Sequence, residues 1–252
     1  MRVALVTGAA GGLGRAVAER LAARGCGVAI ADIDADGTAE TARLVGEGCL
    51  PIVGDLAVEG APEAAVGRVV DRWGRIDVLV NNAAYGVIEP FLEATHAAWT
   101  RTLALNVTAL AMACKAAGQA MTAQGAGRIV NVTSPGSRMA LPDYAAYTAS
   151  KAAVDSITRA AAVALAPFGV LVNSVAPGMM DTEMQRSTEA ALARVNGRKD
   201  LEAFLDERTK RVPLGRRAEI GEVADAVVWL ALDAPAYMTA ERLNMSGGLD
   251  KD

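Results

Sequence analysis

Histidine is almost absent from this chain of 252 residues, which contains only His96. A histidine-rich metal site is therefore excluded, and we predict no metal site. A Ser-His-Asp hydrolase would have to rely on this one imidazole, which stands in the polar surroundings typical of a helix start. We interpret His96 as a solvated surface residue.

Cysteine and aromatic residues are also scarce. The three cysteines, Cys26, Cys49 and Cys114, lie far apart and form no C-x-x-C motif. An odd, scattered set favours reduced thiols over disulfides, and we expect the three to be small buried hydrophobic groups. Hydrophobic residues make up 52% of the chain but aromatic residues only 4%, so the core should be aliphatic.

The chain lacks both a long apolar run and an excess of positive charge. No apolar stretch reaches the ~18 residues of a membrane-spanning helix, and no secretory signal precedes the first strand-like run. We therefore expect a soluble cytoplasmic protein. The net charge of −4 argues against nucleic acid or an anionic membrane as the main partner, so a small molecule is the expected ligand.

Strand-length apolar runs alternate with segments of helical periodicity. This repetition predicts an α/β fold of Rossmann type, a doubly wound parallel sheet of about seven strands with helices on both faces. We expect a single dinucleotide-binding and catalytic domain over residues 1–252. The expected strands are 2–7, 28–33, 50–56, 76–83, 128–134, 170–178 and 242–248. The expected helices are 13–25, 36–46, 61–73, 100–124, 147–166 and 219–232.

The segment 183–213 interrupts this alternation. It is long, highly charged and helical in pattern, and it lies between two sheet elements at the side where strands end. Long insertions at that side are usually lids or walls of a substrate site, which is our interpretation here. The alternative is a mobile, solvated segment without a function.

A glycine-rich turn follows the first expected strand. In the run TGAAGGLG, Gly8, Gly12 and Gly14 stand at the start of a helix, where a bare backbone and free N–H groups can bind a pyrophosphate. Asp32 ends the second strand and can accept hydrogen bonds from both ribose hydroxyls of NAD. No lysine or arginine stands within the turn or directly after Asp32 to bind the extra phosphate of NADP. The predicted cofactor is NAD.

Several motifs, taken together, resemble those of the short-chain dehydrogenase/reductase family, in its compact single-domain branch. They are T-G-x-x-x-G-x-G, NNAA at 81–84, LALNV with Asn106, Ser134, YTASK with Tyr147 and Lys151, APGMMDT at 176–182, and LNMSGG near the end. Each motif alone is modest, but their order and spacing over almost the whole chain are specific. The resemblance implies a nicotinamide-dependent oxidoreductase.

Tyr147 and Lys151 lie one helical turn apart. A free phenol has a pKa near ~10 and is a poor base at neutral pH. A cation within about 4–6 Å can lower the pKa of an acid by about 1–3. We expect Lys151 and oxidised nicotinamide to act in this way, so that Tyr147 becomes the general acid/base. Ser134 would hold the substrate oxygen. Tyr144 has no lysine at i+4, and we interpret it as pocket wall.

The resemblance implies the remaining roles. Asn106 would be the fourth catalytic residue, binding a water that connects Lys151 to solvent, and Asp55 would contact the adenine. Asn81 would stabilise the central strand and the cofactor cleft, and Thr182 would hold the carboxamide. The residues expected at the cofactor are Gly8, Gly12, Leu13, Gly14, Asp32, Asp55, Leu56, Asn82, Ala83, Tyr147, Lys151, Pro177, Gly178 and Thr182.

Three positions depart from the usual pattern of the family. Ala84 stands where Gly is usual, Thr239–Glu241 stand where T-G-Q is frequent, and Pro135 follows the serine. We expect the first two departures to tune packing. Pro135 and Met139 leave the shape of the substrate pocket open, but not the chemistry.

The substrate is less well defined than the reaction. We predict interconversion of a secondary alcohol and a ketone, on a polyol, sugar or diol. The alternatives are a cyclic alcohol, a 3-oxoacyl or hydroxyacyl thioester, a catalytically silent NAD-sensing protein, and an epimerase or dehydratase that recycles its NAD. The Ala-rich helices at 100–124 and 147–166 resemble the family's dimer contact, so a homotetramer is expected, with a dimer as second choice.

Overall fold

The computed structural model describes residues 1–250, whose strands form one parallel sheet in the order β3-β2-β1-β4-β5-β6-β7. The strands are β1 (Val3–Thr7), β2 (Gly27–Asp32), β3 (Leu50–Val53), β4 (Val78–Asn81), β5 (Gly127–Val132), β6 (Val170–Pro177) and β7 (Arg242–Met245). The strand order reverses between β1 and β4, which is the topological switch point where open α/β sheets bind ligands. The predicted Rossmann-type α/β fold is confirmed.

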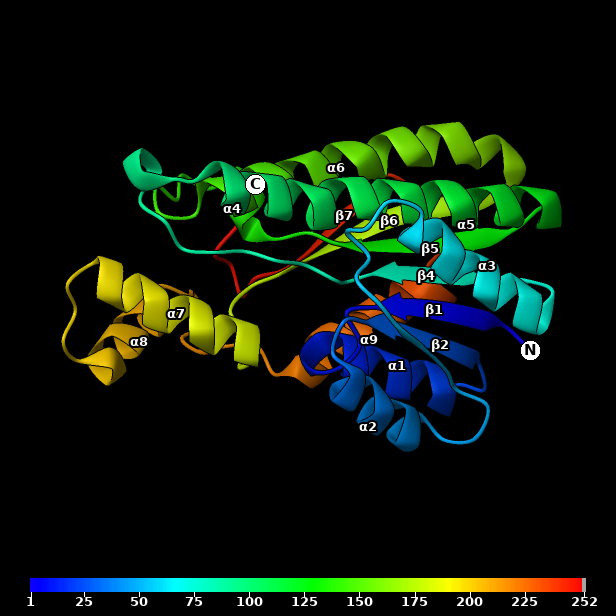
Figure 1. Cartoon of the computed structure of the whole chain (residues 1–252), viewed down its shortest axis with the longest axis horizontal. Helices are drawn as coiled ribbons and strands as arrows, with labels where there is room; N and C mark the ends of the chain where they lie inside the picture. The colour runs from blue at the N-terminus through cyan, green and yellow to red at the C-terminus, as the bar shows by residue number, and fades with distance from the viewer. Residues whose placement is uncertain (251–252) are drawn as a thin grey trace.

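Helices cover both faces of the sheet (Figure 1). On one face lie α1 (Gly12–Ala23), α2 (Ala35–Val45) and α9 (Ile220–Leu232). On the other lie α3 (Ala61–Trp73), α5 (Leu110–Gln124) and α6 (Ala145–Leu165). Strand β1 shows why the apolar runs are continuous: Val3 and Leu5 face the second group of helices, Ala4 and Val6 face the first, and all of them are buried.

The expected helix 100–124 is not one regular helix. It consists of α4 (His96–Leu103), a π-helical segment (Ala104–Ala109) and α5. Asn106 lies inside the π-helical segment, and its side chain bonds the backbone of Tyr85 in a distant loop. Such single π turns occur frequently at functional positions.

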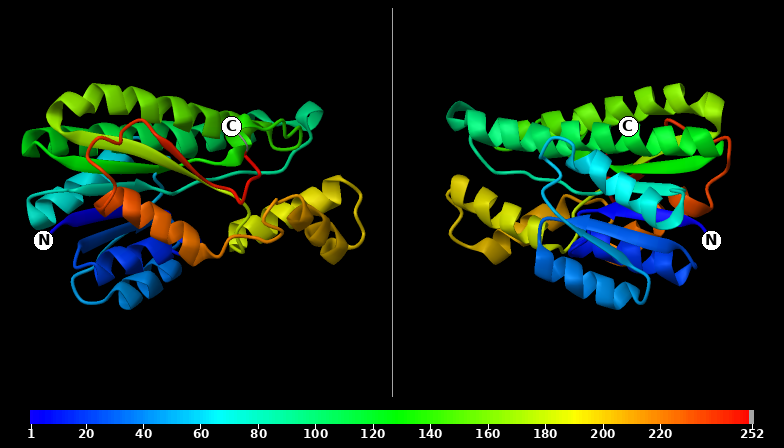
Figure 2. Two further views of the ribbon diagram at one scale, coloured as in Figure 1. Left: turned by 180° about the vertical axis from the view of Figure 1, so that it is seen from behind. Right: turned by 45° about the vertical axis from the view of Figure 1, so that its right-hand side comes forward.

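The segment 183–213 forms α7 (Glu183–Val195) and α8 (Leu201–Lys210), which project from one end of the sheet (Figures 1 and 2). Several expected strands end earlier in the structure, because the residues after them turn into loops. Gly54, for example, donates its N–H to Asp32 O at 2.9 Å, after which the chain leaves β3. Among residues 1–250, none of the helices combines the length and apolarity that crossing a bilayer requires.

Candidate active site

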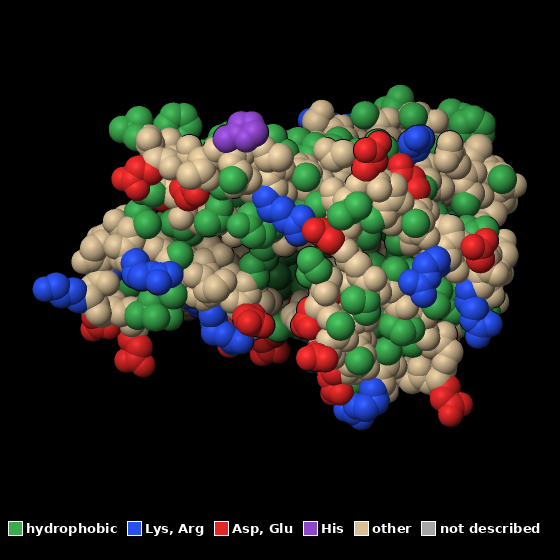
Figure 3. All heavy atoms as spheres, viewed as in Figure 1, with side chains coloured by type: hydrophobic (Ala, Val, Ile, Leu, Met, Phe, Trp, Pro, Cys, Tyr) green, Lys and Arg blue, Asp and Glu red, His purple; other side chains and the backbone are tan. Residues whose placement is uncertain are grey.

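A cavity of about 510 Å³ lies at the carboxyl ends of the strands. Five strands contribute to its wall at or just after their last residue. These wall residues are Gly8 after β1, Asp32 in β2, Asn82 after β4, Ser134 after β5 and Pro177 in β6. Figure 3 shows a hollow lined by apolar side chains near the centre of the molecule. The parallel sheet thus gathers side chains that are far apart in sequence.

The glycine turn fits a pyrophosphate at one side of this cavity. Gly8 and Gly12 adopt φ of +66° and +52°, which favour glycine, and both line the cavity. Gly11 is the N-cap of α1 and makes no side-chain cap, so the first N–H groups of the helix have no side-chain acceptor. A Cβ on Gly11 would meet nothing within 4 Å, which leaves open space beside the turn.

Gly14 is required for close packing of α1 against the turn rather than for contact with a ligand. A Cβ at this position would lie 2.1 Å from Gly8 O and 2.7 Å from Asn82 Nδ2. Asn82 donates from that nitrogen to Thr7 O at 3.0 Å and Gly8 O at 2.8 Å. Gly14 therefore allows α1 to approach the turn, while Gly8, Gly12, Leu13, Asn82 and Ala83 line the cavity.

Asp32 is oriented by the loops around it. Its Oδ2 accepts from Ala10 N at 2.9 Å, and its Oδ1 accepts from Asp34 N at 3.1 Å. The carboxylate lines the cavity and retains lone pairs for two hydroxyl donors. A role for Arg15 was not predicted from the sequence. Its guanidinium reaches the same turn and donates to the carbonyls of Ala10 and Gly37.

Ser134, Tyr147 and Lys151 line the same cavity. Ser134 follows β5 and caps a short 3₁₀ helix through Gly136 N, at 3.1 Å from its Oγ. Lys151 Nζ donates to Val132 O at 2.8 Å and lies 5.6 Å from the centre of the Tyr147 ring. The carboxyl end of β5 places Ser134, and one face of α6 places Tyr147 and Lys151 beside it.

Burial opposes both charged forms at this site. It raises the pKa of the Tyr147 phenol, and a hydrogen bond with Ser134 offsets part of that rise. Burial also lowers the pKa of Lys151 to about 8, against the attraction of Asp155 one turn further along α6. In the protein alone the pKa of Tyr147 is therefore raised, and the predicted lowering by Lys151 together with oxidised nicotinamide stays a prediction for the cofactor-bound enzyme.

Asn106 is buried beside this group, outside the cavity wall formed by residues 1–250. Its Oδ1 accepts from Tyr85 N at 2.7 Å, and its Nδ2 donates to Tyr85 O at 2.8 Å and Ser150 Oγ at 2.9 Å. Ser150 in turn donates to Tyr147 O at 2.7 Å. The side chain of Asn106 therefore connects the π-helical segment to the start of α6.

Other residues expected at the cofactor are distributed more widely. Pro177, Gly178 and Thr182 line the cavity, and Thr182 also caps α7 by accepting from Gln185 N at 3.2 Å. Asp55 and Leu56 lie outside the cavity wall formed by the described residues. Asp55 instead pairs with Arg101 Nη1 at 2.7 Å, and this guanidinium lowers the pKa of the carboxyl.

Tyr144 and Arg242 lie beside the Ser134–Tyr147–Lys151 group, and only the second was not predicted from the sequence. Tyr144 stacks on Tyr147 with 4.3 Å between ring centres and lines the cavity, as its interpretation as pocket wall expects. Arg242 in β7 donates from Nη2 to Ser134 O at 3.0 Å and so supports the serine from behind. Only the parallel pairing of β6 with β7 brings Arg242 there, and no local sequence signal indicates it.

Comparisons with known proteins agree with this geometry. A family model described as enoyl-(acyl carrier protein) reductase matches residues 8–250. Sorbitol dehydrogenase from Cereibacter sphaeroides is 35% identical over 98% of this chain and 96% of its own length. Both matches span the glycine turn, the three cavity residues and the α7–α8 projection.

Solved structures extend the comparison to the fold. The NAD⁺-bound structure of a xylitol dehydrogenase aligns with a TM-score of 0.93 at 33% identity, covering 98% of each chain. A variant of actinorhodin polyketide ketoreductase with NADPH aligns with a TM-score of 0.94 at 34% identity, covering 100% of this chain and 98% of the other. The two neighbours hold different nicotinamide cofactors.

Proposed function

The chain belongs to the short-chain dehydrogenase/reductase family, and from that premise we propose an NAD-dependent enzyme that interconverts a secondary alcohol and a ketone on a polyol, sugar or diol. Oxidation of alcohols and reduction of ketones is the chemistry of its relatives. The observation that carries the proposal is the shared cavity, in which Ser134, Tyr147 and Lys151 face the glycine turn and Asp32. Residues 1–252 would act as one dinucleotide-binding and catalytic unit.

The residues around the cavity divide the chemistry among them. Bound NAD would supply the hydride acceptor and a positive charge. Tyr147 exchanges the hydroxyl proton of the substrate, and Ser134 stabilises the substrate oxygen as its charge changes. Lys151 uses one of its three N–H donors on Val132 O and keeps two for the ribose and for Tyr147. Asn106 holds the start of α6, and a water at its backbone would connect Lys151 to solvent.

The choice of NAD rests on Asp32. Its carboxylate would accept from the ribose hydroxyls and repel a 2′-phosphate. The Arg15 guanidinium reaches the turn, and it donates to Ala10 O, Gly37 O and Thr41 Oγ1. The substrate class follows from the sorbitol and xylitol dehydrogenases among the relatives. The mixed wall of Met179, Met184 and Gln185 suits a polar molecule with an apolar side.

The proposal is tested by measuring NADH formation from a panel of polyols, sugars and diols, with NAD and NADP in parallel. The Tyr147→Phe variant should lose about 10²–10⁴ in rate. Tyr144→Phe is the matched control, because this stacked neighbour also lines the cavity and should keep its rate within a few-fold. Equal rates for Tyr147→Phe and wild type would contradict the assignment of the base.

Other outcomes favour the rival functions. Turnover only with acyl thioesters would indicate a 3-oxoacyl reductase. Copurified NAD without net NADH production would indicate a cofactor-recycling enzyme or a sensor. A preference for NADP would contradict the assignment of Asp32.

The enzyme is proposed to be a homotetramer, with a dimer as second choice. Val163 near the end of α6 is 74% exposed, and Phe168 just after α6 is 49% exposed. Contiguous exposed apolar patches mark contact surfaces, and the proposal takes these two side chains as part of one. Light scattering at micromolar concentration should report four chains, and a monomer would contradict the proposal.

A further inference from the structure

The α7–α8 projection contains a buried cluster of charges. The carboxylate of Glu189 is 1% exposed, and it accepts from two arginines. Arg217 donates from Nη1 at 2.9 Å and from Nη2 at 3.0 Å, and Arg208 donates from Nε at 3.2 Å. One carboxylate and two guanidinium groups leave this cluster with a net charge of +1.

The unbalanced charge lies at the cavity. Arg208 lines the cavity wall, with its side chain 25% exposed, whereas Arg217 does not line it among residues 1–250. Beyond its bond to Glu189, the Arg208 guanidinium makes one further hydrogen-bond contact in that part of the chain, Nη2 to Met179 Sδ at 3.9 Å, and it lies 5.7 Å from the centre of the Phe204 ring. A thioether is a weak acceptor, so the terminal nitrogens of Arg208 keep most of their donor capacity.

Met179 places this guanidinium within the cavity. It directly follows Gly178 and lines the wall next to the end of β6. Met184 and Leu192 from α7 also line the wall. The wall of this cavity therefore combines an apolar surface with the α8 guanidinium, Ser134 and Tyr147.

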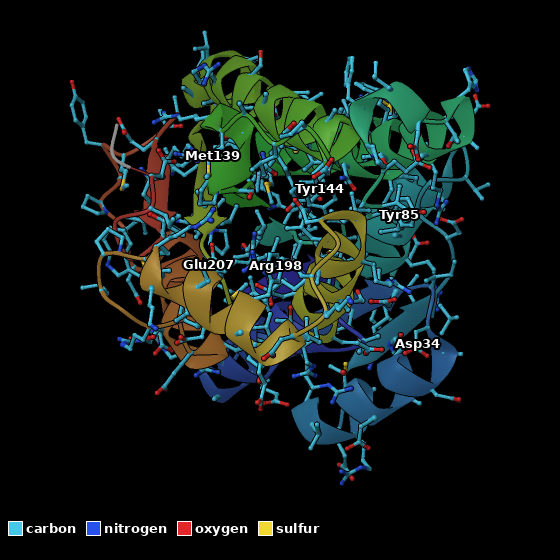
Figure 4. All side chains as sticks on the ribbon, turned by 90° about the vertical axis from the view of Figure 1, so that its left-hand side faces the viewer. Asp34, Tyr85, Met139, Tyr144, Arg198 and Glu207 are labelled. Carbon is cyan, nitrogen blue, oxygen red and sulfur yellow. The ribbon has the colours of Figure 1, made fainter. Side chains whose placement is uncertain are left out.

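Apart from Asp32 and Lys151, which are assigned to the cofactor and to Tyr147, the other charges of the wall are paired or solvated. Arg211 shares Glu207 with Arg198, so that group also carries a net charge of +1, but the Arg211 side chain is 66% exposed and its charge is solvated. Asp143 accepts from Asn196 Nδ2 at 3.4 Å, and Glu183 is exposed. Figure 4 shows the outer side of the projection, where Arg198 and Glu207 point toward each other. On the α7–α8 side of the wall, Arg208 is thus the cation that combines surplus charge and unused donors with a mostly buried side chain.

We propose that Arg208 binds an anionic group of the substrate, so that the alcohol oxidised by this enzyme is a hydroxy acid and the ketone a keto acid. This inference rests on the proposed function and narrows its substrate class to molecules that carry a carboxylate. The Arg208 guanidinium would take the carboxylate, the Met184 and Leu192 surface would contact the carbon body, and Tyr147 would take the hydroxyl. Charge-assisted hydrogen bonds in a partly desolvated wall correspond to about tenfold to hundredfold in affinity.

Binding of two matched probes tests the proposal without turnover. Cyclohexanecarboxylate and cyclohexanecarboxamide have nearly the same shape and differ by one charge, and neither carries a hydroxyl to oxidise. Isothermal titration of the NADH-saturated wild-type enzyme should show at least about tenfold tighter binding of the carboxylate. Because no reaction is involved, the result stands even if the assignment of Tyr147 fails.

Three variants locate the effect. Arg208→Met should remove the preference for the carboxylate and leave the carboxamide affinity unchanged, because Arg217 still holds Glu189. Arg208→Lys should restore part of the preference. Arg216→Met is the control, since Arg216 pairs with Glu222 at 2.7 Å on the surface and should change neither affinity.

The proposal is overturned by any of three results. The first is equal affinity for both probes, or no binding of the carboxylate, in the wild-type enzyme. The second is an equal loss of both affinities in Arg208→Met, which would show that Arg208 only supports the projection. The third is weaker NADH binding in Arg208→Met with an unchanged probe preference, which would assign the guanidinium to the cofactor phosphates.

Discussion

The sheet with its covering helices and the α7–α8 projection are held together by different forces. In the sheet, buried aliphatic side chains form one cluster on each face. The projection contributes to neither cluster within residues 1–250, and charged pairs are frequent there, such as Arg198–Glu207, Lys210–Asp206 and the Glu189 group. The proposed catalytic residues lie on the sheet and its covering helices, and the proposed anion-binding Arg208 lies on the projection. Related enzymes can therefore change substrates without disturbing the catalytic group.

The largest loss of stability is expected at Gly14, where α1 packs against the glycine turn and the backbone leaves no room for a side chain. Gly14→Ala would place a methyl group 2.1 Å from Gly8 O, a backbone atom held by Asn82. We expect a loss of about 4 kcal/mol or more in the free energy of unfolding, enough to leave little folded enzyme. Urea denaturation followed by circular dichroism measures it.

Gly11→Ala is the control for this substitution. Gly11 is extended, at φ −166°, and a methyl group there meets nothing within 4 Å. Its stability should change by less than about 1 kcal/mol. Equal stabilities of the two variants would show that the turn is as adaptable as the projection, which would remove the contrast between them.

The next largest effect concerns the projection itself. Glu189→Gln leaves Arg208 and Arg217 facing each other without a carboxylate, and we expect local opening to become easier by about 3 kcal/mol. Amide hydrogen exchange within 183–210 should accelerate by about a hundredfold, while exchange in β1 and β5 stays unchanged. This outcome would show that the projection opens independently of the sheet.

Asp206→Asn is the matched control. Asp206 pairs with Lys210 at 2.6 Å, but its side chain is 62% exposed, so the pair is worth less than about 1 kcal/mol. If Glu189→Gln accelerated exchange equally in β1 and in the projection, the two regions would unfold as one unit and the contrast would be wrong.

The same contrast explains how far the sequence could be interpreted. The central strands were predictable, because strands buried on both faces are continuous apolar runs, as in VALVT of β1. The glycine turn, Asp32 and the Ser134–Tyr147–Lys151 group were predictable because each lies at the end of a strand or on one helix face. The fold and the cavity wall follow from local pattern and parallel topology.

What could not be predicted depends on distant partners. The π-helical segment exists where Asn106 bonds Tyr85, and Arg242 reaches Ser134 only through the pairing of β6 with β7. From the sequence, Glu189 would be interpreted as a solvated residue of a charged helix. Its burial depends on the two arginines that pair with its carboxylate. Burial of the Tyr147 phenol, which raises its pKa in the protein alone, also depends on distant partners and is not visible in the spacing of Tyr147 and Lys151.

A third prediction concerns the free energy of unfolding that is lost because Lys151 is buried on α6, next to the sheet. Its folded pKa is about 8 against an ordinary value of 10.5, so between these values the unfolded chain holds a proton that the folded chain has released. Stability must then rise with pH in this window. Relative to Lys151→Met, the free energy of unfolding of the wild type should rise by about 2 kcal/mol between about pH 7 and pH 9.5.

The comparison with Lys151→Met cancels the groups that both proteins share. Burial raises the pKa of Cys49 to about 11 and that of Cys114 to about 12, and these thiols lower the stability of both proteins at high pH. If the free energies of unfolding of the two proteins changed in parallel with pH, Lys151 would be solvated in solution. The surroundings of Lys151 would then be as open to water as the projection.

The smallest effect is expected at a strained position on the sheet side. Ala240 has φ +65° and is the only non-glycine residue with positive φ in the described part of the chain. It stands within the T-G-Q position of the family, so this departure is a matter of backbone strain and not only of packing. Its N–H donates to Val172 O at 2.8 Å, which holds the conformation.

Ala240→Gly should therefore stabilise the protein, because the gain from relieving backbone strain exceeds the two costs of the substitution. Relief of the left-handed conformation gains about 1–2 kcal/mol. The freer unfolded chain costs about 0.4–1 kcal/mol, and the half-buried methyl group costs a few tenths more. The net gain of about 0.5 kcal/mol should appear as a higher urea midpoint with an unchanged slope. A lower midpoint would show that packing of the methyl outweighs the strain, so that close packing governs even the edge of the sheet.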